Sequence, residues 1–253
     1  MIPVPERARP VARPIVASAA RLVTAETSTL HRPSNVLPRA EEVLAICAHP
    51  DDESFGLGAV LAALSEQGAR VRLLCFTHGE ASTLGDTDRP LGEVRTEELE
   101  AAANTLGVMA VTLHGYPDGH LFDVALEELT ALVDEESAGA GLLLAFDEGG
   151  ITGHPDHVRA TQAALAFAAS RGLPVLGWAL PEVVAAQLNT ELGTGFVGRR
   201  PEELDFAVEV DRASQRAAIA RHASQSGDNP VLWRRLELLD TSEHLRWLLA
   251  PTE

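Results

Sequence analysis

The chain has 253 residues, a mass of 26.9 kDa and a formal net charge of −17, from 20 basic and 37 acidic residues. This length suits one α/β domain with a sizeable core. The negative charge argues against nucleic acid and anionic membrane surfaces as partners, and no apolar run is long enough to span a membrane.

The first 40 residues differ in composition from the rest of the chain. They contain six arginines, two glutamates and several prolines. Such a segment has little apolar surface to bury. We therefore expect residues 1–40 to form a flexible basic leader and residues 41–253 to form the folded domain.

After this leader, short apolar runs alternate with longer helical patterns. The runs predict strands at residues 43–48, 71–76, 108–113, 142–146 and 175–180, with an edge strand at 206–210. The longer patterns predict helices at 56–67, 92–106, 124–136 and from 155 onward, and we expect the rest of the C-terminal part to be helical. This alternation predicts a Rossmann-like α/β fold, with a mostly parallel sheet and helices on both faces. Ligands of such sheets bind outside the carboxyl ends of the strands.

The two cysteines, Cys47 and Cys75, lie within predicted strands. We interpret them as small buried residues of a protein in a reducing compartment, and so expect a cytoplasmic location. A metal-ligand role for Cys47 is the less favoured alternative, because its side chain should alternate to a packed face.

Two polar motifs follow the first and fourth predicted strands, and we expect them to lie at the same edge of the sheet. The first, Ala48–Glu53, contains a histidine and two adjacent aspartates, and the second, Gly153–His157, contains two histidines three positions apart. Either motif alone is also typical of turn and helix-capping chemistry. Together they suit a catalytic zinc site, in which three protein ligands leave a position for water. One aspartate would bind the metal while its neighbour stays free, and one of the four ligand candidates would have a catalytic role instead.

With these motifs the chain resembles the LmbE-like (PIG-L) deacetylases, the family of the glycosylphosphatidylinositol de-N-acetylases and of the mycothiol and bacillithiol biosynthetic deacetylases. The resemblance runs from about residue 41 to residue 226. It rests on Ala48–Glu53 and Gly153–His157, which are highly specific, and on weaker motifs at Thr77–Glu80, Arg95–Glu98, Leu106–Val108, Pro117–Gly119 and His222–Gln225.

The resemblance implies that His49, Asp52 and His157 bind one zinc ion per chain, with another divalent metal left open. It implies that Asp51 is the general base that acts on the metal-activated water.

Further roles follow from the same resemblance. His154, oriented by Asp156, would stabilise the oxyanion or protonate the leaving amine. Arg95 and Asp118 match positions that contact sugar hydroxyls. Their alternatives are an exposed salt bridge between Arg95 and Glu98 and a turn-forming Asp118.

We therefore predict a zinc-dependent hydrolase that removes an acetyl group from the nitrogen of an amino sugar or sugar conjugate. A zinc amidase that acts on a non-sugar amide is the alternative enzyme, and a metal-holding protein without turnover is the rival from another class. The expected partner is a small N-acetylated sugar compound, and a homo-oligomer is left open.

Three features of the sequence leave questions. Mycothiol-type members have a tyrosine at the position of Thr152, whereas the only tyrosine in this chain is Tyr116. The role of His222 does not follow from its motif, and its alternative is a polar group that structures the C-terminal helix. We expect few aromatic side chains near the site, namely Phe55, Tyr116 and Phe122, which favours a sugar over a long acyl chain.

Overall fold

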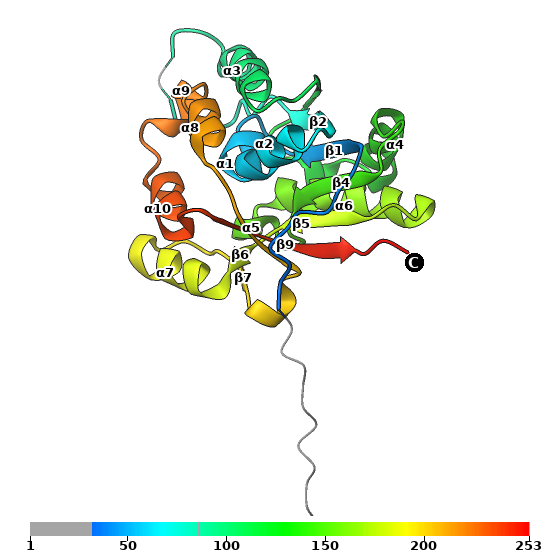
Figure 1. The fold of residues 1–253 in the computed structure, drawn as a ribbon. Coiled ribbons are helices and arrows are strands. Elements are labelled where there is room, and N and C mark those ends of the chain that lie inside the picture. The colour runs from blue at the N-terminus through cyan, green and yellow to red at the C-terminus, as the bar shows by residue number, and fades with distance from the viewer. Residues whose placement is uncertain (1–31, 86, 253) are drawn as a thin grey trace, which may run out of the picture. The chain divides into compact units, whose positions relative to one another are not determined.

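The computed structural model describes residues 32–85 and 87–252 (Figure 1). Most of the predicted leader, residues 1–31, lies outside the described residues. Among those described, no helix is long and apolar enough to cross a membrane.

The main sheet contains seven strands, which are β1 (Glu42–Cys47), β2 (Arg70–Thr77), β3 (Ala110–Tyr116), β4 (Leu142–Phe146), β5 (Val175–Trp178), β8 (Phe206–Glu209) and β9 (Ser242–Leu249). A small parallel pair contains β6 (Leu180–Pro181) and β7 (Gly198–Arg199). The α-helices are α1 (Asp52–Phe55), α2 (Gly58–Glu66), α3 (Leu91–Thr105), α4 (Leu126–Glu136), α5 (Gly150–Gly153), α6 (Pro155–Arg171), α7 (Glu182–Leu192), α8 (Ala213–Ile219), α9 (Ala223–Ser226) and α10 (Pro230–Leu239). Two 3-10 helices occupy Leu121–Asp123 and Pro201–Glu203.

The strand order is β3-β2-β1-β4-β5-β9-β8. The first five strands in this order are parallel, and β9 is antiparallel to both β5 and β8. The predicted Rossmann-like α/β fold with a mostly parallel sheet is therefore confirmed, and the predicted edge strand is β8.

The prediction that the C-terminal part is helical is wrong at Ser242–Leu249, which forms β9. This segment has charged residues beside apolar ones. Its Glu243 is not exposed but buried in an ion pair with Arg212. Pairing with strands on both sides decides its conformation, and no local pattern in the segment reveals those partners.

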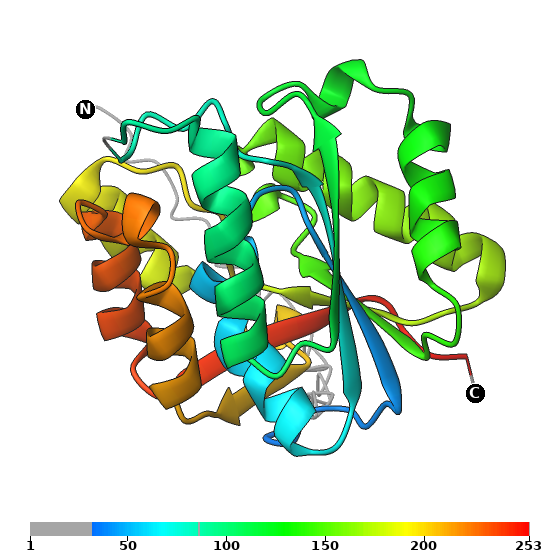
Figure 2. The same ribbon diagram turned by 90° about the horizontal axis from the view of Figure 1, so that it is seen from above.

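The sheet is covered on both faces (Figure 2). Val43, Ala45 and Cys47 of β1 belong to the core on the side of α2, α3, α7 and α8. Leu44 and Ile46 belong to the core on the side of α4 and α6. A strand buried on both faces needs apolar residues throughout, which explains the continuous apolar run in the sequence.

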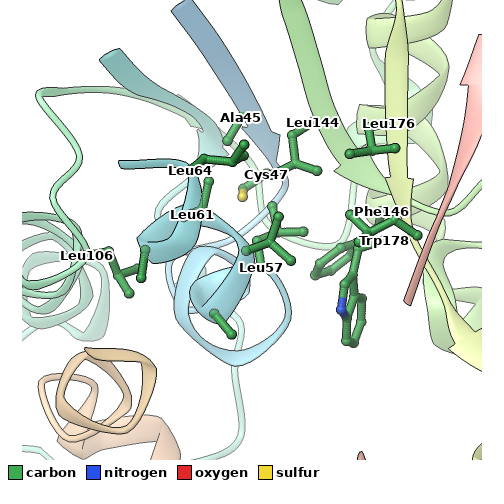
Figure 3. Packing of buried hydrophobic residues seen from close by; sticks show 14 of the residues in the cluster. Ala45, Cys47, Leu57, Leu61, Leu64, Leu106, Leu144, Phe146, Leu176 and Trp178 are labelled. Carbon is green, nitrogen blue, oxygen red and sulfur yellow. The ribbon is translucent and has the colours of Figure 1, made fainter. Parts of the chain in front are cut away.

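Helix α2 packs directly against β1. Its Leu57 N-cap and the leucines Leu61 and Leu64 lie against Ala45 and Cys47 (Figure 3). Both cysteines are buried and free, as expected for small core residues.

The chain order of the strands reverses direction at β1. Strands β2 and β3 lie on one side of β1, whereas β4 and β5 lie on the other. Open α/β sheets form a crevice at such a point, beyond the carboxyl ends of the two central strands. The motifs Ala48–Glu53 and Gly153–His157 follow β1 and β4, so the fold brings both to this crevice.

Candidate metal centre

A tight turn follows β1 and sets the directions of the first motif. Asp51 has φ 120° and ψ −24°, a backbone conformation that costs a non-glycine residue of order 1–3 kcal/mol. The Glu53 carboxylate holds this conformation by accepting the N–H of Asp51 at 2.9 Å. The Asp52 Oδ2 atom accepts the N–H groups of Ala48 (2.9 Å) and His49 (3.0 Å). The turn thus fixes the Asp52 carboxylate through one oxygen and leaves Oδ1 for other contacts.

Side chains of both motifs converge in front of β1 and β4. The Nδ1 atom of His49 lies 3.1 Å from Nε2 of His157, and that Nε2 atom lies 3.1 Å from Oδ1 of Asp52. The Nδ1 atom of His49 lies 3.9 Å from Oδ2 of Asp52. Tetrahedral zinc with bonds of about 2.0–2.2 Å separates its ligand atoms by about 3.3–3.6 Å. The three side chains therefore have the spacing of a metal-binding set.

His154 belongs to the same cluster. One ring nitrogen from each of His49, His154 and His157 lies within 4.8 Å of the others. Distances alone therefore admit either Asp52 or His154 as a third ligand.

The outer ring nitrogens of two histidines face hydrogen-bond acceptors. The Nε2 atom of His49 lies 2.9 Å from Oδ1 of Asp118 and 3.3 Å from Oδ2 of Asp156. The Nδ1 atom of His157 lies 3.1 Å from the carbonyl oxygen of Gly150. Donation of the outer N–H leaves the lone pair of the inner nitrogen directed at the centre, as is usual for histidines that bind metals.

The charge of this cluster attracts a cation. Burial favours a neutral His49 ring, yet its hydrogen bonds to Asp118 and Asp156 raise its pKa to about 10, so the metal-free ring carries a proton that a bound metal would replace. Burial would also raise the pKa of Asp52, but His157 and His49 hold it well below its usual value. In charge, as in the kind and spacing of its donor atoms, the centre fits a divalent metal.

Asp51 points to a buried arginine. Its Oδ2 atom lies 3.0 Å from Nη2 of Arg95, whose guanidinium also donates to the carbonyls of Gly79 (2.6 Å) and Pro50. Burial raises the pKa of Asp51 to about 6, although Arg95 opposes the shift. A carboxylate whose pKa lies near neutral pH suits a general base.

The alternative role of Arg95, an exposed salt bridge with Glu98, is wrong, whereas its contact with a sugar stays a prediction. Arg95 is 3% exposed and bound to Asp51 and two carbonyls, so it is not an exposed partner of Glu98 and has few donors left for a sugar. Gly79, with φ 65°, lies against the guanidinium, and a Cβ at this position would collide with it. The motif Thr77–Glu80 therefore needs a glycine at this position, because a side chain would collide with Arg95.

The prediction that Asp156 orients His154 needs correction. The contact is made by the backbone, where the N–H of Asp156 donates to Nδ1 of His154 at 3.2 Å and caps α6. The Asp156 carboxylate instead accepts the N–H groups of Gly119 (2.7 Å) and Leu121 (3.1 Å) and faces His49. Burial, His157 and His49 lower the pKa of His154. With Nδ1 as an acceptor, the neutral ring carries its proton on Nε2.

Asp118 contacts His49 and the backbone, and its predicted role as a sugar contact stays a prediction. Its Oδ1 atom faces His49, and its Oδ2 atom accepts the N–H of Ala81 at 2.9 Å. Both oxygens are thus held by the protein, and Asp118 orients a histidine of the centre.

The centre opens into a cavity of about 520 Å³. Seven of the eight predicted site residues line this cavity, namely His49, Asp51, Asp52, Arg95, Asp118, His154 and His157. The eighth, Asp156, is fully buried against His49.

The aromatic residues around the cavity differ from those expected. Phe55 does line it, as do Phe146 and Trp178, which lie at the end of β4 and β5. Tyr116 and Phe122 are not among the lining residues, so their predicted place near the site is wrong. The Tyr116 hydroxyl donates to Glu128 at 2.7 Å, and Phe122 is 47% exposed. Thr152 lines the cavity without supplying a phenol group.

Glu53 and His222 form a buried pair behind the site, which the sequence did not reveal. Their Oε1 and Nε2 atoms lie 2.6 Å apart. Both residues occur in the family motifs, but nothing in the sequence shows that they meet. The contact links α9 to the turn that carries Asp51.

This fold and this site define a Rossmann-like α/β protein with a histidine–aspartate centre at the switch point of its sheet. The chain belongs to the PIG-L family, described as GlcNAc-PI de-N-acetylase, which it matches over residues 44–168. A 1D-myo-inositol 2-acetamido-2-deoxy-alpha-D-glucopyranoside deacetylase of Nakamurella multipartita is 32% identical to it, over 72% of this chain and 79% of that protein.

Two further similarities agree with this membership. A deacetylase of the same name from Kineococcus radiotolerans is 35% identical over 64% of this chain, and the match spans 54% of that relative's length. The structure of N,N'-diacetylchitobiose deacetylase from Pyrococcus horikoshii has a TM-score of 0.58 and 25% identity, covering 83% of this chain and 84% of that one.

Proposed function

We propose that this protein is a zinc-dependent N-deacetylase that releases acetate from an N-acetylglucosaminyl compound. The observation that carries the proposal is the convergence of His49 Nδ1, His157 Nε2 and the Asp52 carboxylate, with Asp51 next to Asp52 in the chain. Family membership and the deacetylases named above support the reaction and the substrate class. The free buried cysteines support a cytoplasmic location.

We assign Asp52 rather than His154 as the third ligand. The Asp52 carboxylate is anchored by two backbone N–H groups and directs Oδ1 toward His157. His154 is anchored through Nδ1, which leaves its Nε2–H as a donor for a substrate oxygen.

The bound metal would supply Lewis-acid activation of water and of the acetamide carbonyl. Asp51 accepts a proton from the attacking water as the water oxygen bonds to the carbonyl carbon. The Nε2–H of His154 donates to the carbonyl oxygen as negative charge develops there. When the C–N bond breaks, the proton held by Asp51 passes to the leaving amine, and acetate is the other product.

An acetate-release assay with N-acetylglucosamine and an N-acetylglucosaminyl inositol tests this proposal, with zinc content measured on the same samples. We expect about one zinc per chain. Asp51→Asn should keep the zinc and lose about 10²–10⁴ in turnover, the usual effect of removing a general base, whereas Asp52→Asn should lose the zinc.

Two outcomes would contradict the proposal. Full zinc content in both Asp52→Asn and His157→Ala would show that the metal set is wrong. Acetate release from simple non-sugar acetamides at the same kcat/KM as from the sugars would favour the general amidase.

A further inference from the structure

Arg235 has an unusual environment within the cavity. It lies on α10, is 9% exposed and lines the cavity. Its Nη2 atom donates to the carbonyl of Phe55 at 2.7 Å. Within residues 32–85 and 87–252, its buried Nε atom has no hydrogen-bond partner and its guanidinium has no carboxylate within 4.0 Å.

The nearby carboxylate of Glu243 already has other partners. Glu243 lies 2.5 Å from Nη1 of Arg212 and accepts the Nε1–H of Trp178 at 2.6 Å. Burial lowers the pKa of Arg235 to about 10, so its guanidinium is still charged at neutral pH. A buried charge is unfavourable unless it is paired. Arg235 thus presents to the cavity a positive charge that is not paired at close range.

A row of aromatic rings connects Arg235 with the metal centre. The ring of Phe146 lies 4.9 Å from that of His157 and 5.4 Å from that of Trp178. The guanidinium carbon of Arg235 lies 5.2 Å from the centre of the Trp178 ring. Figure 3 shows Phe146 and Trp178 side by side at one end of the core cluster. A group bound to Arg235 is thus set apart from the acetamide at the metal centre.

Arg95, the other arginine that lines the cavity, is bound to Asp51 and to two carbonyls. We propose that Arg235 forms an anion-binding subsite that selects N-acetylated sugars bearing a carboxylate or phosphate group. The inference rests on the proposed deacetylase function, because it places that anion on the same substrate. The guanidinium of Arg235 lies over the Trp178 ring and is held by the carbonyl of Phe55, and its planar set of N–H donors matches carboxylate and phosphate oxygens.

Calorimetric binding to the zinc-loaded Asp51→Asn protein tests the subsite without turnover. The probes are neutral N-acetylglucosamine, N-acetylmuramic acid with a carboxylate, and the 1-phosphate and 6-phosphate of N-acetylglucosamine. We expect at least one anionic sugar to bind about 10- to 100-fold more tightly than the neutral sugar, the usual range for hydrogen bonds to a charged group. The carboxylate and phosphate probes show which anion is preferred.

Adding Arg235→Gln should abolish this preference and leave binding of the neutral sugar unchanged. Arg234→Gln is the matched control, because Arg234 lies on the same helix but pairs with Glu191 and Glu237 at the surface. It should change nothing. Arg235→Lys keeps the charge without the planar fork, and we expect it to fold and to retain part of the preference. Thermal unfolding of each variant verifies the fold.

The subsite is refuted if no anionic sugar binds more tightly than the neutral one, or if Arg235→Gln weakens all probes by the same factor. Acetate release by the unmodified protein tests the reaction separately. Release without anion preference would refute the subsite alone. Anion preference without release from any probe would refute the deacetylase function alone.

Discussion

Asp118 and Asp156 show how a carboxylate in this site acts through a neighbouring side chain. Both face Nε2 of His49, at 2.9 and 3.3 Å, and both are also held by backbone N–H groups. They therefore fix the orientation of the ring and the nitrogen that faces the centre. Removing either carboxylate should affect metal binding before it affects sugar binding.

For Asp118→Asn we expect zinc affinity to fall by about 10- to 100-fold, the usual effect of losing such a partner. The measurement is competition with a chelator of known affinity. Because zinc at saturating concentration should restore most activity, KM for the sugar should change little. An unchanged zinc affinity with a raised KM would instead support the predicted role of Asp118 as a sugar contact.

The sequence was most informative where a short segment itself fixes the geometry. The residues after β1 and β4 were predictable because their strands are apolar throughout and their polar motifs begin where the strands end. The partners of Arg95, Asp118 and Asp156 were not predictable. Each depends on which loops meet across the crevice, and that follows from tertiary packing.

The same limit explains why the sequence predicted neither the strand β9 nor the aromatic residues that line the cavity. Glu243 is charged in sequence but buried in the fold, because Arg212 and Trp178 pair with it. Phe146 and Trp178 end strands whose side chains alternate between the two faces. The sequence alone did not show that both rings border the cavity.

The Glu53–His222 pair connects α9 with the turn that begins α1. Burial favours a neutral His222, but Glu53 raises the pKa of the ring above its ordinary value. A group whose pKa is raised on folding stabilises the fold fully below its unfolded pKa of about 6.5. That contribution is lost as the pH rises through the folded pKa.

His222→Ala should therefore destabilise the metal-free protein most strongly near pH 6, by about 3–5 kcal/mol as for other broken buried pairs. The difference from the unmodified protein should shrink toward pH 9, as measured by urea unfolding in the presence of a chelator. His120→Ala is the control, since His120 pairs with Asp123 at the surface. A difference that stays constant with pH would show that His222 contributes packing alone.

Across the folded domain, the candidate metal centre lies at the switch point of the sheet. The two central strands carry the motifs, while the flanking parallel strands supply Gly79 and Asp118 from the loops after β2 and β3. Helices on both faces fix these strands, so the loops at their carboxyl ends are held by a rigid frame. The antiparallel pair β8 and β9 extends the sheet away from this centre, and Glu243 of β9 accepts the Nε1–H of Trp178, whose ring lies against Arg235.

The outer edge of the sheet is completed by residues that the sequence assigned to the leader. The N–H of Ser34 donates to the carbonyl of Asp205 at 2.7 Å, and its carbonyl accepts the N–H of Ala207 at 2.9 Å. Leu37 is 4% exposed and belongs to the main core. These contacts lie beside β8, at the far end of the sheet order from β3.

Two truncations should therefore behave differently. Because its composition predicts little buried surface, removal of residues 1–31 should leave both the Tm and acetate release unchanged. Removal of residues 1–38 also deletes Leu37 and the bonds of Ser34, and should lower the Tm by about 5–15 °C, given the usual effect of losing a buried leucine. Equal Tm values for the two truncated proteins would show that Leu37 and Ser34 add nothing to stability. If the protein without residues 1–31 instead stays folded but loses acetate release, these residues take part in the active site or in an interface.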